Sequence, residues 1–148
     1  MAVVGDVEVV RTQAPHGHVP SETDLDQALA AHPGILACLL IRPGDFTQTA
    51  WSEDRLLKLV SWCRRSGISL ISNETHAATT VFADGSAVQS NIVEEADIIV
   101  WDLGGTFAAV GAGCSVAFCK KLELVTALKA ANPLHTLPKV AQAVFAQL

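Results

Sequence analysis

Four polar side chains follow apolar runs of the chain, where they could do acid–base chemistry: Asp45, Asn73, His76 and Asp102. An imidazole exchanges protons near neutral pH, and a neighbouring carboxylate can orient it. If the apolar runs are parallel strands, their carboxyl ends meet at one edge of a sheet, which makes His76 and Asp102 a candidate general acid/base pair. The alternative interpretation is that all four are polar loop residues without a catalytic role.

The elements that would position these side chains alternate between apolar runs and amphipathic segments. Apolar or β-branched runs predict strands at 7–11, 35–41, 68–72, 97–101 and 114–119. Amphipathic segments predict helices at 21–32, 52–67, 120–132 and 135–148. This order predicts a three-layer α/β fold with a mixed, mostly parallel sheet of about five strands and helices on both faces.

The first two predicted helices carry boundary signals. Ser21 and Ser52 are predicted N-caps, and Asp24 follows Ser21 at the spacing of a capping box. Gly67 is predicted to end the second helix. The apolar stripe of that helix is predicted to face the core and consists of Leu56, Leu59, Val60 and Cys63.

The composition predicts one compact domain with few kinds of partner. The chain has 148 residues, of which 50% are hydrophobic and 17% are charged, and its net charge is −5. A basic surface for nucleic acid is therefore not expected, and neither is a membrane span, because no apolar run is long enough. The N-terminus lacks a basic leader, so no signal peptide is expected. The cysteines lie in apolar runs without CxxC spacing, which favours reduced thiols and hence a cytoplasmic protein. The apolar surplus favours a surface covered by another chain or by a missing part of the protein.

No metal site is predicted. The cysteines Cys38, Cys63, Cys114 and Cys119 show no CxxC spacing and lie in apolar runs, which favours reduced, buried thiols. His16 and His18 lie between prolines without a cysteine or acidic partner at ligand spacing, which favours a loop.

Three stretches carry a resemblance to a known family: "LLIRPGDFTQTAW", "SEDRLLKLVSWCRRSGISLISNETHAATTVF" and "ADIIVWDLGGTFAAVGAGCSVAFC". Their order and spacing resemble the large domain of the fold-type-I pyridoxal-phosphate (PLP) enzymes, and most closely the class I/II aminotransferases and the aminocyclopropane-carboxylate synthases. The resemblance covers about 7–148 but only the middle of a family member, so we expect a truncated, degenerate domain. It implies amino-acid or specialised metabolism and a dimeric assembly.

The resemblance also implies where the catalytic groups would stand. The Schiff-base lysine of the family matches Gly105, which has no amine. The aspartate that keeps the cofactor's pyridine nitrogen protonated matches Asn73, an amide without charge. The tyrosine that contacts the ring oxygen matches His76, which can still donate a hydrogen bond.

The phosphate-binding positions of the family differ as well. A serine and an arginine that hold the phosphate match Asp102 and Gly113, so a carboxylate replaces a hydroxyl and a cation is lost. The asparagine of the family's first loop matches Asp45. These are vestigial cofactor positions, and no bound cofactor is expected; PLP would be the cofactor if the family activity survives.

Three hypotheses about function follow. The first is an aminotransferase-like pseudoenzyme or interaction partner, as a homodimer or a heterodimer with a full-length aminotransferase-like chain. The second is an enzyme of amino-acid or specialised-metabolite biosynthesis with a refitted pocket that uses His76 and nearby carboxylates such as Asp102. The third is an aminotransferase that a partner chain completes.

Overall fold

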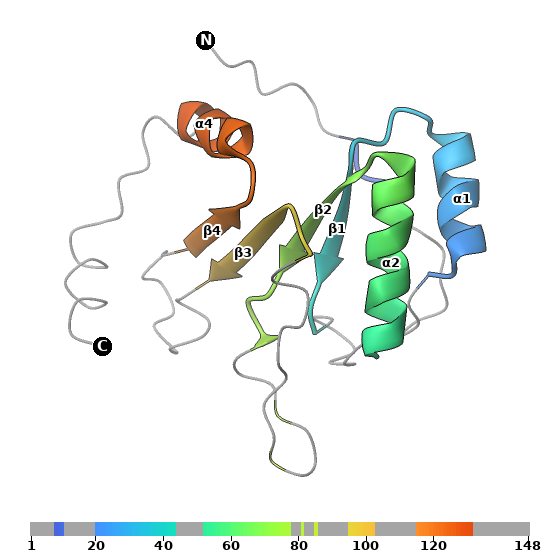
Figure 1. Cartoon of the computed structure of the whole chain (residues 1–148), viewed down its shortest axis with the longest axis horizontal. Coiled ribbons are helices and arrows are strands. Elements are labelled where there is room, and N and C mark those ends of the chain that lie inside the picture. The colour runs from blue at the N-terminus through green and yellow to red at the C-terminus, as the bar shows by residue number, and fades with distance from the viewer. Residues whose placement is uncertain are drawn as a thin grey trace, which may run out of the picture.

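The computed structural model describes residues 8–10, 20–43, 52–77, 81, 85, 95–102 and 115–131 (Figure 1). These residues form a sheet of four strands with three helices. In chain order the elements are α1 (Glu22–Ala31), β1 (Ala37–Ile41), α2 (Glu53–Ser66), β2 (Ser69–Asn73), β3 (Ile98–Asp102), β4 (Ser115–Cys119) and α4 (Leu122–Ala131). The alternation of strands and helices confirms the predicted α/β class.

The strands lie in the order β1-β2-β3-β4. The first three are parallel, with Leu39 opposite Ile71 and Ile71 opposite Ile98. The fourth runs antiparallel to β3 and places Ser115 opposite Asp102. The sheet is therefore mostly parallel, as predicted, although the described residues supply four strands rather than about five.

The predicted strand at 7–11 was wrong for its described part, because Glu8–Val10 form no strand. A β-branched run becomes a strand only where another strand pairs with its backbone, and that pairing is not local in sequence. The predicted last helix, at 135–148, lies outside the described residues.

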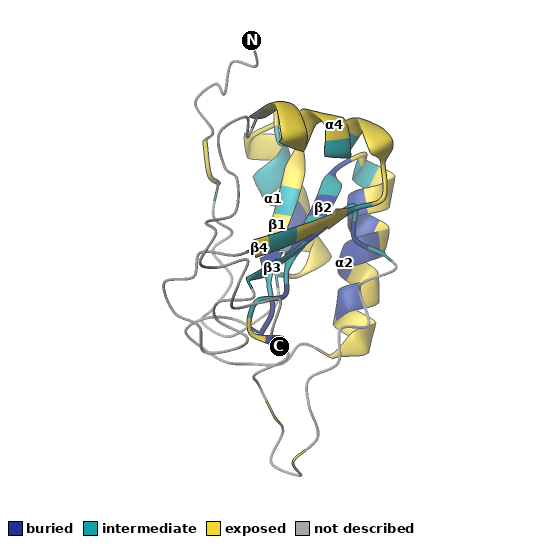
Figure 2. Cartoon of the chain, turned by 90° about the vertical axis from the view of Figure 1, so that its left-hand side faces the viewer, coloured by how far each residue is buried: buried dark blue, intermediate teal, exposed yellow. Residues whose placement is uncertain are grey.

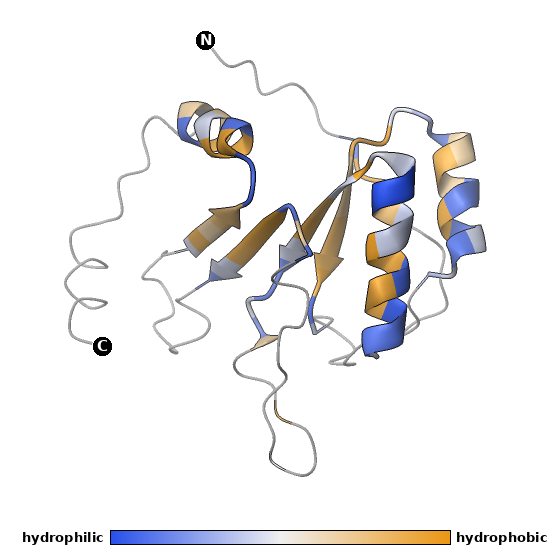
Figure 3. Ribbon diagram, in the orientation of Figure 1, coloured by the Kyte–Doolittle hydropathy of each residue, from blue (hydrophilic) through white to orange (hydrophobic). Residues whose placement is uncertain are grey.

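The hydrophobic core lies between α2 and one face of the sheet. The middle parts of the strands are mostly apolar and the carboxyl ends of β2 and β3 are polar, whereas α2 alternates between an apolar and a polar side (Figure 3). The buried side of α2 faces the strands (Figure 2). The four residues of its predicted stripe are all buried, and Trp62 is buried with them. On the strands, Leu40, Leu70 and Ile99 complete this core, and Leu25 of α1 joins it.

The helix boundaries follow the local sequence. Ser21 caps α1: its hydroxyl accepts from the Asp24 amide at 3.2 Å, and the Asp24 carboxylate accepts from the Ser21 amide at 2.8 Å. Gly67 ends α2 with φ +66°, a left-handed conformation that glycine adopts without steric penalty. Ser52 is the N-cap residue of α2, but its side chain makes no capping hydrogen bond.

Replacing Ser21 with alanine is expected to lower the free energy of unfolding by about 1 kcal/mol at neutral pH, because the N-terminal amides of α1 lose their cap. Hydrogen bonds from the Ser21 side chain and backbone lower the pKa of Asp24 below its ordinary value. The stability that these hydrogen bonds contribute is therefore present above the ordinary pKa of aspartate. It is lost as the pH falls through the lowered pKa that Asp24 has in the folded chain. Urea unfolding at neutral and acidic pH should show the difference from wild type shrinking in acid. A difference that grows in acid would contradict this account.

Within the described residues, no helix combines the length and the apolar character that crossing a membrane requires.

Candidate site at the carboxyl edge of the sheet

The carboxyl ends of β1, β2 and β3 meet at one edge of the sheet, and β4 begins at the same edge (Figure 1). Arg42 follows β1, Asn73 and Asp102 end β2 and β3, and Ser115 opens β4. In a mostly parallel sheet, ligands bind outside this edge. The described part of the predicted site therefore stands where a ligand site is expected.

Thr75 connects two of the predicted site residues. Its backbone N–H and its hydroxyl both donate to Oδ1 of Asn73, at 3.1 and 2.6 Å. The same hydroxyl accepts from the backbone N–H of Asp102 at 3.3 Å. The hydroxyl of Ser115 lies 3.5 Å from Oδ1 of Asp102. The edges of β2, β3 and β4 are thus joined by one continuous set of polar contacts.

A buried ion pair lies beneath this edge. Nη1 of Arg42 is 3.8 Å from Oε1 of Glu74, and the two side chains are only 4% and 3% exposed. The hydroxyl of Ser72 donates to the same carboxylate oxygen at 2.6 Å. Backbone bonds from Arg42 to Asn73 and from Glu74 to Val100, both 2.8 Å, hold the three strand ends together. Because both charges are buried, removing either partner would leave the other buried without compensation.

The sequence did not single out Arg42, Glu74 or Thr75. Glu74 lies within a polar stretch that reads as loop, and no spacing pattern marks it as buried. A signal existed for Thr75 alone, because an asparagine two residues before a threonine favours an Asx turn.

The remaining predicted site residues have different outcomes. His76 is exposed and lies at this edge, one residue after Thr75, while the Asp102 side chain is partly buried. Their joint acid–base role stays a prediction. Asp45, Gly105 and Gly113 lie outside the described residues. Within the described part of the chain, no group of three His, Cys, Asp or Glu side chains is placed to hold a metal ion.

The geometry of Asn73 does not suit a PLP ring. A backbone N–H can only donate, so the atom that it contacts must be the amide oxygen, and Thr75 engages that oxygen twice. The remaining hydrogen-bonding group of the Asn73 amide is its NH₂ group, which can only donate. A protonated pyridine nitrogen needs an acceptor, whereas a donor at this position favours the unprotonated nitrogen. At the ring-nitrogen position that the resemblance implies, such a donor would oppose the protonation that makes the ring an electron sink.

Among the described residues, the charges at this edge do not suit a phosphate group either. Asp102 places a carboxylate at the end of β3, and Arg42, the cation after β1, is buried against Glu74. Lys120 and Lys121 follow β4, which is antiparallel to β3, so they lie at the opposite edge of the sheet. The backbone N–H of Lys120 donates to Asp97, before β3, and the Lys121 ammonium pairs with the Asp97 carboxylate. Five residues of strand separate these edges by roughly 16 Å.

Comparison with known proteins identifies the fold. No protein-family model matches the chain, and no curated protein matches it in sequence. Among solved structures, the PLP-bound C-S lyase from Staphylococcus hominis is similar with a TM-score of 0.69 at 20% identity, over 86% of this chain and 33% of that one. Cystalysin from Treponema denticola, which contains PLP, is similar with 0.68 at 21% identity, over 84% and 32%. A double mutant of the Thermus thermophilus aspartate aminotransferase is similar with 0.63 at 18% identity, over 78% and 29%.

The chain therefore has the fold of part of the large domain of PLP-dependent aminotransferases and C-S lyases, as the sequence resemblance predicted. It spans about a third of the length of the solved structures that it matches. At these identities the likeness shows the fold alone.

Proposed function

We propose that this chain is an aminotransferase-like protein without PLP catalysis that acts by binding another protein chain. The observation that carries the proposal is the commitment of the Asn73 oxygen to Thr75, which leaves a hydrogen-bond donor where a PLP enzyme of this fold needs a carboxylate. The resemblance places Gly105 at the position of the cofactor lysine, which adds the loss of the amine. Asp102 adds a negative charge at the phosphate position.

Exposed apolar side chains support the interaction role. Leu39 is exposed on β1, one outer strand of the described sheet, and Leu36 is exposed just before that strand. Phe118 is exposed on β4, the other outer strand. Leu122 is exposed at the start of α4. Leu39 and Phe118 lie on opposite faces of the sheet, since Phe118 pairs with the core residue Ile99 and Leu39 alternates with the core residue Leu40. Leu39 on the outer strand β1 is the position where we place the partner chain. The partner that fits the proposal is a second copy or a full-length aminotransferase-like chain.

The second candidate is an enzyme that uses the same edge without PLP. His76 is exposed and Asp102 partly buried there, and Thr75 fixes the backbone of Asp102. An imidazole and a carboxylate at one sheet edge could move a proton of a small amino-acid-like substrate. An aminotransferase completed by a partner chain stays a third candidate, since a partner could supply an amine.

The proposal is tested by titrating the purified chain with PLP and recording the absorbance spectrum. A full-length aminotransferase serves as the positive control. We expect the spectrum to be the sum of free PLP and protein, because the donor at Asn73 and the carboxylate of Asp102 both oppose binding. A saturable spectral change with a defined stoichiometry would refute the loss of PLP binding.

The interaction role is tested separately by analytical ultracentrifugation of the chain alone and mixed with a full-length aminotransferase. We expect either a species heavier than the monomer for the chain alone, or a species in the mixture heavier than the aminotransferase by itself, and Leu39→Glu should weaken it. A monomer in every sample would refute the interaction role and leave the result with PLP standing.

A further inference from the structure

A small cavity lies between the C-terminal half of α2 and the amino edge of the sheet, which is the edge opposite Asp102. Its volume is about 160 Å³, which leaves room for a molecule several times the size of water. The apolar part of its lining is buried and consists of Val60, Cys63, Ile68 and Leu70. The charged part consists of Arg64, Glu95, Asp97 and Lys120. A buried apolar surface with a few charged groups beside it is the usual form of a small-molecule site.

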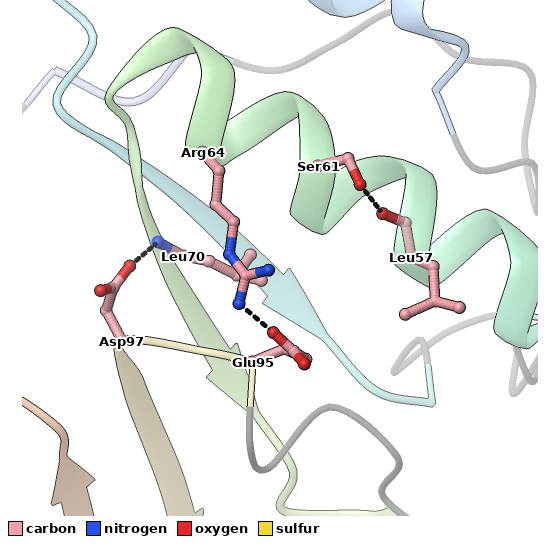
Figure 4. Close-up of polar contacts among 6 residues, drawn as sticks. All are labelled: Leu57, Ser61, Arg64, Leu70, Glu95 and Asp97. Atoms are coloured by element: carbon pink, nitrogen blue, oxygen red, sulfur yellow. Dashed lines mark hydrogen bonds and ion pairs between the residues drawn. The ribbon is translucent and has the colours of Figure 1, made fainter.

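Both carboxylates of this lining already have partners. The Asp97 carboxylate accepts from the Leu70 amide at 2.9 Å, and its Oδ1 atom lies 3.4 Å from Nζ of Lys121. Arg64 reaches from α2 to the carboxylate of Glu95, which lies just before β3 (Figure 4). The two anions are therefore neutralised by the protein itself and leave little for a cationic ligand.

The two cations of the lining have donors left over. Among the described residues, no carboxylate pairs with the Lys120 ammonium. The backbone N–H of Lys120 donates to the Asp97 carbonyl at 3.1 Å, which fixes this residue beside the cavity. Arg64 binds Glu95 through Nη2, and in the described part of the chain its Nε and Nη1 donors have no partner. The unused hydrogen-bonding capacity of the site is therefore a set of charged donors.

The charge balance of the cavity also favours an anion. The lining together with Lys121 has three cations (Arg64, Lys120 and Lys121) and two anions (Glu95 and Asp97), a surplus of one positive charge. The carbonyl oxygens at the end of α2 would repel an anion if they were free. Those of Cys63 and Arg64 accept instead from the amides that follow the helix, at 2.9 and 3.3 Å.

We propose that this cavity binds a small monocarboxylate with a short, branched aliphatic body. The carboxylate accepts from the Lys120 ammonium and from the free N–H groups of Arg64, and the aliphatic body lies against Ile68 and Leu70. Its single negative charge balances the surplus of the lining, and the apolar area that it buries adds to the affinity. The site is at the other edge of the sheet from the candidate site, so it does not depend on the proposed function.

The test is a titration of the isotope-labelled full chain with sodium isobutyrate, followed through the amide resonances by NMR. We expect saturable shifts of the Leu70 and Lys120 amides, which both donate to Asp97 at the cavity. The Thr75 amide, which donates to Asn73 at the opposite edge, should not shift. We expect a dissociation constant on the order of 1 mM, because so small a ligand makes few contacts. Sodium chloride at the same concentrations serves as the blank.

Two variants and one neutral ligand complete the test. Lys120→Gln should weaken the binding of isobutyrate by about fivefold or more, because a charged donor is lost. Lys129→Gln makes the same change of net charge on α4, at a residue that does not line the cavity, and should leave binding unchanged. Isobutyramide, which has the shape of isobutyrate without its charge, should not bind.

The proposal is overturned if isobutyrate causes no saturable shift of the Leu70 and Lys120 amides, or if isobutyramide shifts them to the same extent. It is also overturned if Lys120→Gln binds isobutyrate as tightly as Lys129→Gln does. The comparison of the two ligands on the wild-type chain decides the question even if a variant does not fold.

Discussion

Replacing Arg42 with methionine is expected to lower the free energy of unfolding by about 3–5 kcal/mol. The Glu74 side chain is 3% exposed, and without the guanidinium its carboxylate would be buried with no compensating cation. The Ser72 hydroxyl would still donate to it at 2.6 Å, but one neutral donor does not replace a charge. Equilibrium urea unfolding at neutral pH measures the loss.

Lys58→Met is the matched control. Lys58 and Asp54 are 2.7 Å apart, closer than Arg42 and Glu74, yet their side chains are 64% and 72% exposed. An exposed pair of this kind contributes about 0.3–0.5 kcal/mol, so the control should unfold nearly as wild type. The double variant Arg42→Met with Glu74→Leu should recover part of the loss, because no isolated charge remains buried. If Arg42→Met costs no more than Lys58→Met, the ion pair does not hold the edge.

Replacing Leu70 with alanine is expected to cost about 2–5 kcal/mol, the range for a leucine truncated in a packed core. Leu70 is 2% exposed at the centre of the cluster between the sheet and α2, and it also lines the cavity beside Cys63. Truncation removes apolar contacts and enlarges that cavity, which the neighbouring helix and strands can fill only in part. The loss should appear as a lower midpoint of urea unfolding with a similar slope.

Leu57→Ala makes the same chemical change on the exposed side of α2 and serves as its control. Leu57 is 49% exposed, so its truncation creates no cavity and should change stability by about 0.5 kcal/mol or less. Equal losses for the two variants would mean that the core is not centred on Leu70.

Features with a local signature could be predicted from the sequence. The apolar spacing in 52–66 identified the buried face of α2, and the glycine after it identified the left-handed end. The serine and aspartate at the start of α1 identified its capping box. In each case the residues that make the interaction are within a few positions of one another, so the pattern and the physical cause coincide.

Features that depend on distant pairing could not be predicted. The carboxylate of Glu74 is buried only because Arg42 from another strand reaches it. Trp62 is buried outside the predicted stripe, in the cluster that Leu25 of α1 joins, and its indole N–H donates to Asp26 of α1 at 2.7 Å. The direction of β4 likewise depends on its pairing with β3, and that direction carries Lys121 to the edge opposite Asp102.

At the candidate site, the resemblance identified the positions but not their hydrogen bonds. Asn73 could be matched to a family aspartate from the sequence alone. The two hydrogen bonds from Thr75 to its oxygen become visible only in the fold. Besides the lost charge, they leave a hydrogen-bond donor at a position where the family has an acceptor.

Whether PLP bonds to this chain is decided by intact-mass spectrometry. The 148-residue chain is incubated with excess PLP and reduced with borohydride, and its intact mass is measured. A full-length aminotransferase is treated in the same way as the control. We expect the aminotransferase to gain one reduced PLP on a single lysine and this chain to keep its unmodified mass. One PLP per chain on a single lysine, suppressed when a competing phosphate-bearing analogue is present, would contradict the loss of PLP catalysis.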